Sequence, residues 1–238
     1  MRLKPSYSEK KHDYHAHTKF SDGALTVEES VLKRIPHIDV IGISDHYRFL
    51  MSEGDKLDQY CNTITAFRET LGERSGDLKL GIEIFWVDIP YAIKHLTQYP
   101  FDFIIIENFE FFVDQIEVFR VIDMLQEALK RKENKVEIIL AHPDYKVWFG
   151  HLDRAADTSI DKVLTYLRDN EIAIELNANT GYFFREKDVI GALTNAEDYI
   201  VQALKRNDSL LSVGTDSHGY EAALFRDYHL VYEYFMLC

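Results

Sequence analysis

Short apolar runs alternate with amphipathic stretches along nearly the whole chain, and this alternation limits the fold more than any other feature. The runs are rich in Ile, Val, Leu and Phe, as in parallel strands that are covered on both faces. They predict strands at about 13–17, 39–44, 79–86, 101–106, 136–141, 172–176 and 211–214. The stretches between them predict helices over Val27–Arg34, Lys56–Glu73, Tyr91–Gln98, Asp114–Lys132, Ile160–Asp169 and Ala196–Asn207.

About seven βα units suit either a closed barrel or a doubly wound open sheet, and the polar residues at the strand ends favour the barrel. Barrels gather their active sites at the carboxyl ends of the strands, where the βα loops converge. An open sheet would concentrate such residues at one switch point. Here they follow six different strands, as His17, Asp45-His46, Glu83, His142, Asn177 and Asp216-Ser217-His218.

His15 and His17 lie two apart in the first predicted strand, and Asp22 follows in a Ser-Asp-Gly turn. Side chains at i and i+2 of a strand point to the same face, so the two imidazoles can bind one ion. A lone His-x-His pair is weak evidence, because surface histidines are common. The other histidines and carboxylates at strand ends strengthen it, and the sequence therefore predicts a metal site.

With 238 residues and 46% hydrophobic content, the chain is long enough for one α/β domain with a large core. We expect a single domain over 1–238, with a barrel core over about 12–219. The segment 220–238 is apolar for a chain end. We expect it either to pack on the barrel or to form a subunit interface in a homodimer.

The net charge of −13 disfavours broad binding of nucleic acid, because a polyanion would be repelled. The sequence also shows no basic strip and no aromatic stacking platform. It contains no apolar run of the roughly 20 residues that cross a bilayer, and its first residues lack the apolar segment of a signal peptide. We therefore expect a cytoplasmic protein without a membrane partner.

The ordered motifs resemble the PHP (polymerase and histidinol phosphatase) family of metal-dependent phosphoesterases. The resemblance rests on HAHT with SDG, then SDH, GIE, AHP, ELN and DSH, and it runs from about His12 to Gly219. The segment ELNANTGYFFR is most similar to the histidinol-phosphatase branch. SDGALTVEE is also similar to the branch that acts on nucleoside bisphosphates and short oligonucleotides, so both branches stay open.

The resemblance implies a distorted seven-stranded (β/α)7 barrel, TIM-like, with two or three divalent ions (zinc, manganese or iron) at the carboxyl ends of the strands. It implies a first ion held by His15, His17, Glu83 and Asp216. Glu83 would bridge to a second ion held with His142, and a third ion would be held by Asp22, His46 and His218. Imidazole and carboxylate ligands suit these metals independently of the resemblance.

The chain departs from the family pattern after its fourth strand, where the family has another histidine for the second ion. The segment 101–112, FDFIIIENFEFF, contains no histidine. By strand parity Glu107 faces the same way as Phe109, which stands at the expected ligand position. Glu107 is therefore a candidate replacement, and Asn108 and Glu110 are weaker ones. The departure implies a binuclear site, or a site for a harder, oxygen-preferring ion such as manganese.

The implied reaction is the hydrolysis of a small-molecule phosphomonoester, similar to histidinol phosphate, by a metal-bound hydroxide. Asp216 or a nearby histidine, such as His218, would manage protons, and Arg185 is the candidate phosphate clamp. The alternative reading of Arg185 is a solvated loop arginine beside Glu186. The alternatives for the whole chain are a nucleotide or oligonucleotide phosphoesterase and a metal-binding scaffold that has lost turnover.

Four further predictions concern residues around these motifs. His12 is expected to be a solvated histidine, and Asp45 to support a metal ligand from behind. Asn177 is a candidate for orienting a ligand or contacting substrate, although an Asn that ends a strand is also an ordinary turn residue. The segment 144–158 is expected to be a loop, whose Trp148 either lines the pocket or packs.

Overall fold

Eight parallel strands form the sheet of this computed structural model, which describes residues 2–3, 10–154, 159–179, 199–220 and 227–233. Their order in the sheet is β1-β8-β7-β6-β5-β4-β3-β2. Seven of them follow one another in chain order: β2 (His12–Asp13), β3 (Val40–Ile43), β4 (Leu78–Phe85), β5 (Phe103–Glu107), β6 (Glu137–Leu140), β7 (Ala173–Asn177) and β8 (Leu210–Gly214). The eighth, β1 (Arg2–Leu3), was not predicted and pairs with the start of β8.

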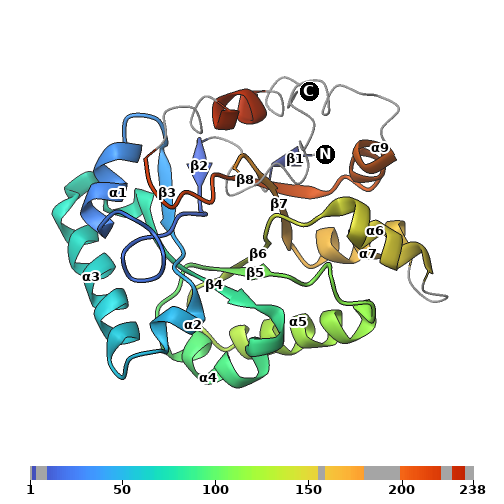
Figure 1. The fold of residues 1–238 in the computed structure, drawn as a ribbon, viewed down its shortest axis with the longest axis horizontal. Helices are drawn as coiled ribbons and strands as arrows, with labels where there is room; N and C mark the ends of the chain where they lie inside the picture. The colour runs from blue at the N-terminus through green and yellow to red at the C-terminus, as the bar shows by residue number, and fades with distance from the viewer. Residues whose placement is uncertain (1, 4–9, 155–158, 180–198, 221–226, 234–238) are drawn as a thin grey trace.

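The seam between the first and last of these seven strands is closed just beyond their ends. Ala16 and Ser217 form a parallel bridge there, and the His17 amide donates to the Ser217 carbonyl at 2.9 Å. The seven strands therefore form a nearly closed barrel with helices between them (Figure 1), which confirms the predicted distorted (β/α)7 fold.

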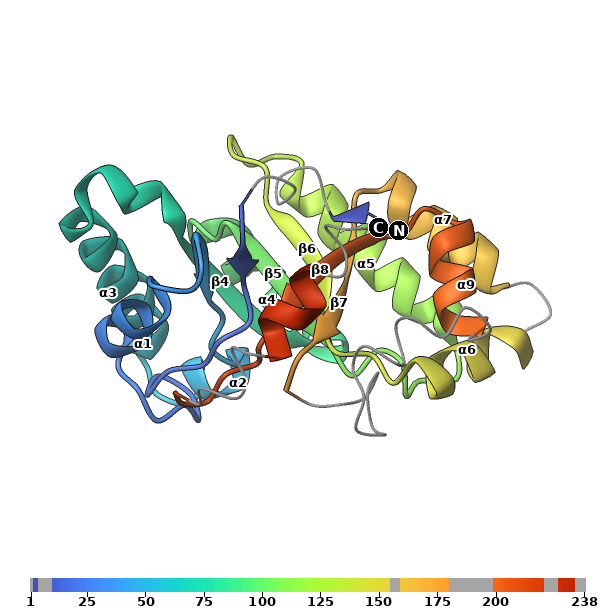
Figure 2. The same cartoon turned by 90° about the horizontal axis from the view of Figure 1, so that it is seen from above.

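Helices follow the strands and cover the outside of the barrel. Figure 2 shows α1 and α3 on one side and α6, α7 and α9 on the other. The α-helices are α1 (Val27–Arg34), α2 (Tyr47–Leu50), α3 (Lys56–Thr70), α4 (Ile89–Gln98), α5 (Gln115–Leu129), α6 (Tyr145–Arg154), α7 (Ile160–Asp169) and α9 (Tyr199–Arg206). Two 3-10 helices, η2 (Gly72–Asp77) and η3 (Trp86–Asp88), flank β4.

Helix α6 corrects the expectation of a loop over 144–158 as far as Arg154, and residues 155–158 lie outside the described residues. The Asp144 carboxylate accepts hydrogen bonds from the amides of Lys146 and Val147, both at 3.1 Å, and so begins the helix. Trp148 and Phe149 are fully buried in the core, so these rings pack and do not line the metal cluster.

The core has two layers, one between sheet and helices and a smaller one inside the barrel. The inner layer consists of Tyr14, Val40, Phe103, Ile105, Ile139, Ala141 and Ala173. A Cβ at Gly81 would lie 2.0 Å from the Phe103 ring, so only glycine leaves room for that ring. These side chains fill the barrel below the carboxyl ends of the strands, where the polar residues lie.

Residues 227–233 are helical and pack at the amino end of the barrel, where Tyr228 and Tyr232 are buried. Tyr228 donates to the His12 carbonyl, and Tyr232 to the Lys10 carbonyl at 2.8 Å. The prediction of a solvated His12 is wrong, because this side chain is fully buried. Burial lowers the pKa of His12 to about 3, so the imidazole is neutral. Within the described parts of the chain, no helix is both apolar enough and long enough to span a membrane.

Candidate metal centre

All eight residues that were predicted to bind metal lie in one cluster at the carboxyl ends of the strands. Four overlapping groups of side chains bring their ligand atoms within 4.8 Å of one another. The groups are His15, His17 and Asp216; His15, Glu83 and His142; His46, Glu83 and Glu107; and His17, Asp22, His46 and His218. Glu107 is the one member outside the predicted eight.

Glu83 is the centre of the cluster, and its side chain is almost completely buried. Its Oε1 lies 3.1 Å from His15 Nε2 and 3.3 Å from His142 Nε2. Its Oε2 lies 3.2 Å from His17 Nε2 and 3.0 Å from His46 Nδ1. One carboxylate on β4 thus faces four imidazoles that come from three other strand ends.

Asp216 follows β8 and completes the inner part of the cluster. Its Oδ1 lies 3.1 Å from His17 Nε2 and 3.4 Å from His15 Nε2. Asp216 and His142 have φ values of 48° and 25°, which non-glycine residues rarely adopt. Both residues are therefore held in strained backbone conformations, as often happens where function fixes a side chain.

Asp22 forms the outer part of the cluster, together with His218 and His46. Its Oδ1 lies 3.3 Å from His218 Nε2, and its Oδ2 lies 3.6 Å from His46 Nε2. The side chains of Asp22 and His218 are 38% and 40% exposed, whereas that of His15 is fully buried. The outer part therefore opens to solvent.

The ionisable groups of the cluster shift one another's pKa values strongly. Burial by itself lowers the pKa of His46 and of His142. The carboxylates beside them outweigh this effect and raise the two pKa values to about 10 and about 9. Burial by itself raises the pKa of Asp216, but His15 and His17 lower it to about 2. Positive charge is therefore strongly favoured among these carboxylates.

Four buried polar atoms of the cluster lie near other ligand atoms but make no hydrogen bond of acceptable geometry to any residue that the structure describes: His15 Nε2, His17 Nδ1, Glu83 Oε2 and Glu107 Oε1. Buried polar atoms normally have partners, and leaving a buried carboxylate oxygen without one is costly. Imidazole nitrogens and carboxylate oxygens are the ligand atoms of zinc, iron and manganese. The cluster therefore fits divalent ions.

Glu175 on β7 was not among the predicted site residues, yet it contacts two members of the cluster. Its Oε1 lies 2.9 Å from His15 Nδ1, and its Oε2 accepts the His142 amide at 2.9 Å. Because a carboxylate accepts, His15 Nδ1 carries the proton and Nε2 is left to face Glu83 and Asp216. A Cβ at Gly214 would lie 1.9 Å from Glu175 Oε1, so glycine is required there. A charged residue inside a buried strand was the signal that could have revealed Glu175.

Asp45 supports the loop that carries Asp22. Among the described residues, its carboxylate forms no hydrogen bond with a histidine ring. It accepts hydrogen bonds from the amide and the hydroxyl of Thr18, both at 2.7 Å, and from the Ser21 hydroxyl at 2.5 Å. Asp45 therefore shapes the loop between His17 and Asp22, and its role in supporting a metal ligand stays a prediction.

A buried ion pair lies beneath the cluster. Arg34 of α1 donates to Asp13, and both side chains are almost fully buried. Asp13 also accepts the amides of His15 at 3.2 Å and Thr215 at 3.1 Å. This carboxylate therefore connects the two chain segments that carry His15 and Asp216 at the barrel seam.

The other predicted site residues divide into three cases. Asn177 is buried behind the cluster and donates to Glu175 Oε2 at 3.1 Å. Phe109 points into the core, where the centroid of its ring lies 5.1 Å from that of Trp148. The position at which the resemblance places a histidine ligand therefore lies outside the cluster. Arg185 lies outside the described residues.

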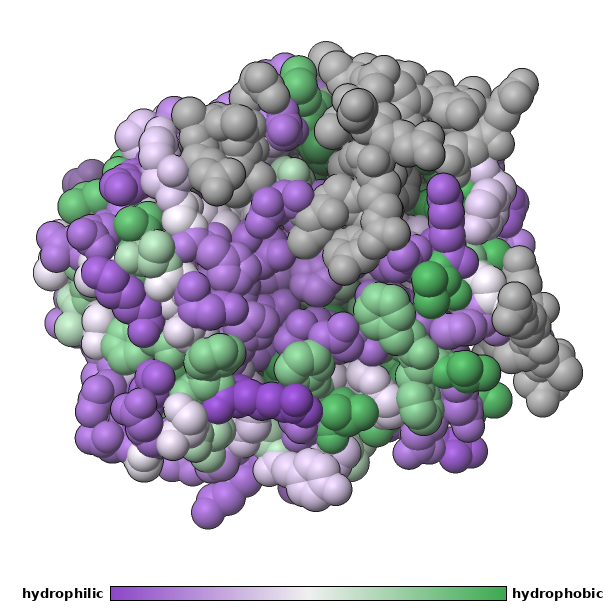
Figure 3. Space-filling model, viewed as in Figure 1, coloured by the Kyte–Doolittle hydropathy of each residue, from purple (hydrophilic) through white to green (hydrophobic). Residues whose placement is uncertain are grey.

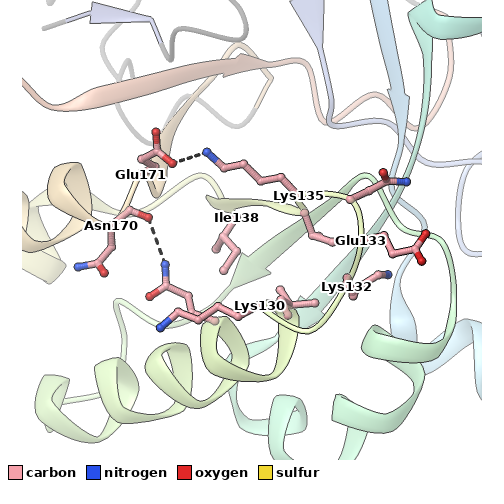
Figure 4. Close-up of a pocket in the computed structure, with 11 residues that line it drawn as sticks. Lys130, Lys132, Glu133, Lys135, Ile138, Asn170 and Glu171 are labelled. Atoms are coloured by element: carbon pink, nitrogen blue, oxygen red, sulfur yellow. Dashed lines mark hydrogen bonds and ion pairs between the residues drawn. The ribbon is translucent and has the colours of Figure 1, made fainter.

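A separate cavity of about 400 Å³ lies near the end of α5 and the start of β6 (Figure 4). Its three lysines already have partners: Lys130 bonds Glu127 at 2.8 Å, Lys132 donates to the Tyr99 carbonyl at 2.5 Å, and Lys135 pairs with Glu171. The three ammonium groups are therefore already engaged, and the described residues build no anion site in the cavity.

The order of these residues along the chain matches a known family. The family model described as PHP domain matches residues 13–179, which is more than half of the chain. The chain belongs to the PHP family. PHP proteins are generally metal-dependent hydrolases, and the His, Asp and Glu side chains of the cluster could hold metal ions. The match does not single out the histidinol-phosphatase branch, and no curated protein matches the chain significantly. Asp216 and His218 lie beyond the matched residues, and it is the barrel closure that brings them into the cluster.

Proposed function

We propose that this PHP protein is a metal-dependent phosphatase that hydrolyses a small-molecule phosphomonoester similar to histidinol phosphate. The observation that carries the proposal is the buried Glu83 carboxylate, which faces four imidazoles beside Asp216. Family membership gives the class of metal-dependent phosphoesterase, and the substrate is our proposal.

The cluster can hold two or three divalent ions, with Glu83 shared between neighbouring groups. Bound ions of this kind lower the pKa of water and stabilise charge on phosphoryl oxygens. The protein's own contribution is orientation, since Glu175 fixes the tautomer of His15 and so directs its Nε2 into the cluster.

Asp216 and His218 are our candidates for moving protons at the open side of the cluster. His218 Nδ1 lies 3.0 Å from the Asp216 backbone carbonyl, which can only accept, so Nδ1 carries the proton. In the neutral imidazole, Nε2 is then unprotonated. It is therefore available as a ligand or as a base next to Asp22.

The surroundings of the cluster support a small ester with a ring or an apolar group. Figure 3 shows hydrophilic side chains in the middle of the face seen in Figure 1, with hydrophobic ones along one border. Phe49 is 44% exposed, and its ring centroid lies 5.9 Å from that of His46. Phe111 and Phe112 are half exposed on the loop after β5. We propose that such rings flank the substrate.

Partners and location are part of the proposal. We propose a small phosphate ester as substrate and no extended nucleic-acid surface, since the net charge is −13. A cytoplasmic location and a homodimer remain predictions from the sequence.

A metal-binding scaffold without turnover is the second candidate. The observation that favours it is that no histidine follows β5, the fourth strand of the family pattern, and that Phe109, at the expected position, is buried in the core. Such a protein would keep its ions and act through partners.

Hydrolysis of p-nitrophenyl phosphate with added Mn²⁺ or Zn²⁺ tests the proposal. We expect turnover by the native protein and its loss in His142→Ala, with His37→Ala as a control because His37 lies outside the cluster. A panel of histidinol phosphate, nucleoside phosphates and short oligonucleotides then identifies the substrate class. Metal binding without hydrolysis of any ester would support the scaffold instead.

A further inference from the structure

Glu107 is the last residue of β5 that faces the inside of the barrel. Phe103 and Ile105 on the same strand belong to the inner core layer, so by alternation Glu107 also points inward. Asn108 follows with φ 61°, and this turn sends Phe109 out toward Trp148. The inward-facing side of β5 therefore ends in a carboxylate.

This carboxylate is 5% exposed and lies beside two members of the cluster. Its Oε1 is 3.3 Å from His46 Nδ1, but it makes no well-aligned hydrogen bond with any of the described residues. Its Oε2 accepts the Asn108 side-chain amide at 2.9 Å. Glu83 Oε2 lies 3.0 Å from the same His46 nitrogen, and within the described parts of the chain it too lacks a hydrogen bond of acceptable geometry. Two buried carboxylate oxygens thus face one imidazole nitrogen.

Such an arrangement needs a positive charge to compensate it, because burying carboxylates away from water is costly. The arginine nearest in sequence to His46 bonds elsewhere, as Arg48 Nε donates to Asp88 at 2.6 Å and its guanidinium lies over the Phe85 ring. A protonated His46 supplies this charge when no ion is bound. A bound cation can take the place of the Nδ1 proton, and its ligands would then be two carboxylates and one imidazole.

We propose that His46, Glu83 and Glu107 form an ion position of their own, which prefers the oxygen-seeking ions Mn²⁺ or Mg²⁺ to Zn²⁺. Carboxylate-rich ligand sets suit those ions, whereas imidazole-rich sets suit zinc. The position differs from the outer group around Asp22, since His46 faces Asp22 through Nε2 and faces Glu107 through Nδ1. A neutral imidazole has one free nitrogen, so His46 binds an ion on one side at a time.

The inference shares with the proposed function only the premise that the cluster binds ions, because it does not require hydrolysis. The test therefore counts ions. Metal-depleted native protein, Glu107→Gln and Glu107→His are equilibrated with Mn²⁺ or with Zn²⁺, and bound metal per chain is measured, with Mn²⁺ also followed by electron paramagnetic resonance. Glu110→Gln is the matched control, since Glu110 is a buried carboxylate on the same segment but belongs to none of the metal groups.

We expect Glu107→Gln to lose one Mn²⁺ per chain relative to native protein and to keep its Zn²⁺. Glu107→His should bind Zn²⁺ at this position in place of Mn²⁺. Zinc binding by this variant would also show that the protein folds with a different side chain at position 107. Glu110→Gln should match the native counts. Equal Mn²⁺ counts and affinities in native protein and in both Glu107 variants would overturn the inference, whatever the esterase activity.

Discussion

Glu175→Gln removes one negative charge behind the metal cluster while keeping the shape of the side chain. In the native protein one oxygen of Glu175 accepts a hydrogen bond from His15 Nδ1, and the other accepts one from the His142 amide. A glutamine has only one oxygen, so its NH₂ group must face one of these donors. If it faces His15, the imidazole is driven to the tautomer with its proton on Nε2, where the ion should bind.

The size of the effect follows from the role of Glu175 as a carboxylate behind a metal-ligating histidine. Loss of such a partner typically lowers metal affinity by about 10- to 100-fold. This corresponds to about 1.4–2.7 kcal/mol of binding free energy. The effect should concern the most deeply buried ion, because His15 belongs to the one group whose three members are all buried, His15, His17 and Asp216.

Competition with a chelator of known affinity, with bound Mn²⁺ or Zn²⁺ as the readout, measures this loss without any need for substrate. Glu171→Gln is the control, because Glu171 is an exposed glutamate just before β7 that pairs with Lys135. Its affinity should equal that of the native protein. An affinity of Glu175→Gln within about threefold of native would refute the reasoning about tautomer control.

Three further changes test the surroundings of the cluster. Gly214→Ala should destabilise the protein by about 1–3 kcal/mol and also weaken metal binding, because its Cβ would displace Glu175; urea unfolding and a metal titration measure the two effects. Asp13→Asn should cost about 3–5 kcal/mol in urea unfolding, since it leaves the Arg34 charge buried without its carboxylate, and a loss below about 1 kcal/mol would contradict this. In metal-free protein the raised pKa of His46 contributes stability that is fully present below the unfolded pKa of about 6.5 and is lost as pH rises through about 10. The free energy of unfolding, measured with urea, should therefore fall from pH 7 to pH 10. An unchanged free energy over this range would contradict the raised pKa.

The barrel and the positions of the cluster residues could be predicted from the sequence because both depend on local patterns. Six of the seven predicted strands are found close to their predicted bounds, whereas the first, predicted over 13–17, is only His12–Asp13 with a bridge at Ala16. A parallel barrel places every strand end on one face. His17, His46, Glu83 and His142 therefore come together without any knowledge of side-chain packing, and the bridge at Ser217 brings in Asp216.

Other features depend on contacts that local patterns do not contain. His12 is buried because Tyr228 and Tyr232, from the far end of the chain, pack over it. Strand parity correctly placed Glu107 inside, but it failed at Phe109 because the positive φ of Asn108 breaks the alternation. Helix α6 had a readable signal, since Tyr145, Trp148, Phe149 and Leu152 are spaced as on one helical face and all are buried.

The most direct measurement of the central claim is the number of divalent ions per chain in protein purified without chelator, compared between native protein and Glu83→Gln. Glu83 faces four imidazoles, so its loss should empty more of the cluster than any other single change. We predict two or three ions per native chain and a clear reduction in the variant. A native count near zero, or equal counts in the two proteins, would contradict a metal centre built around Glu83.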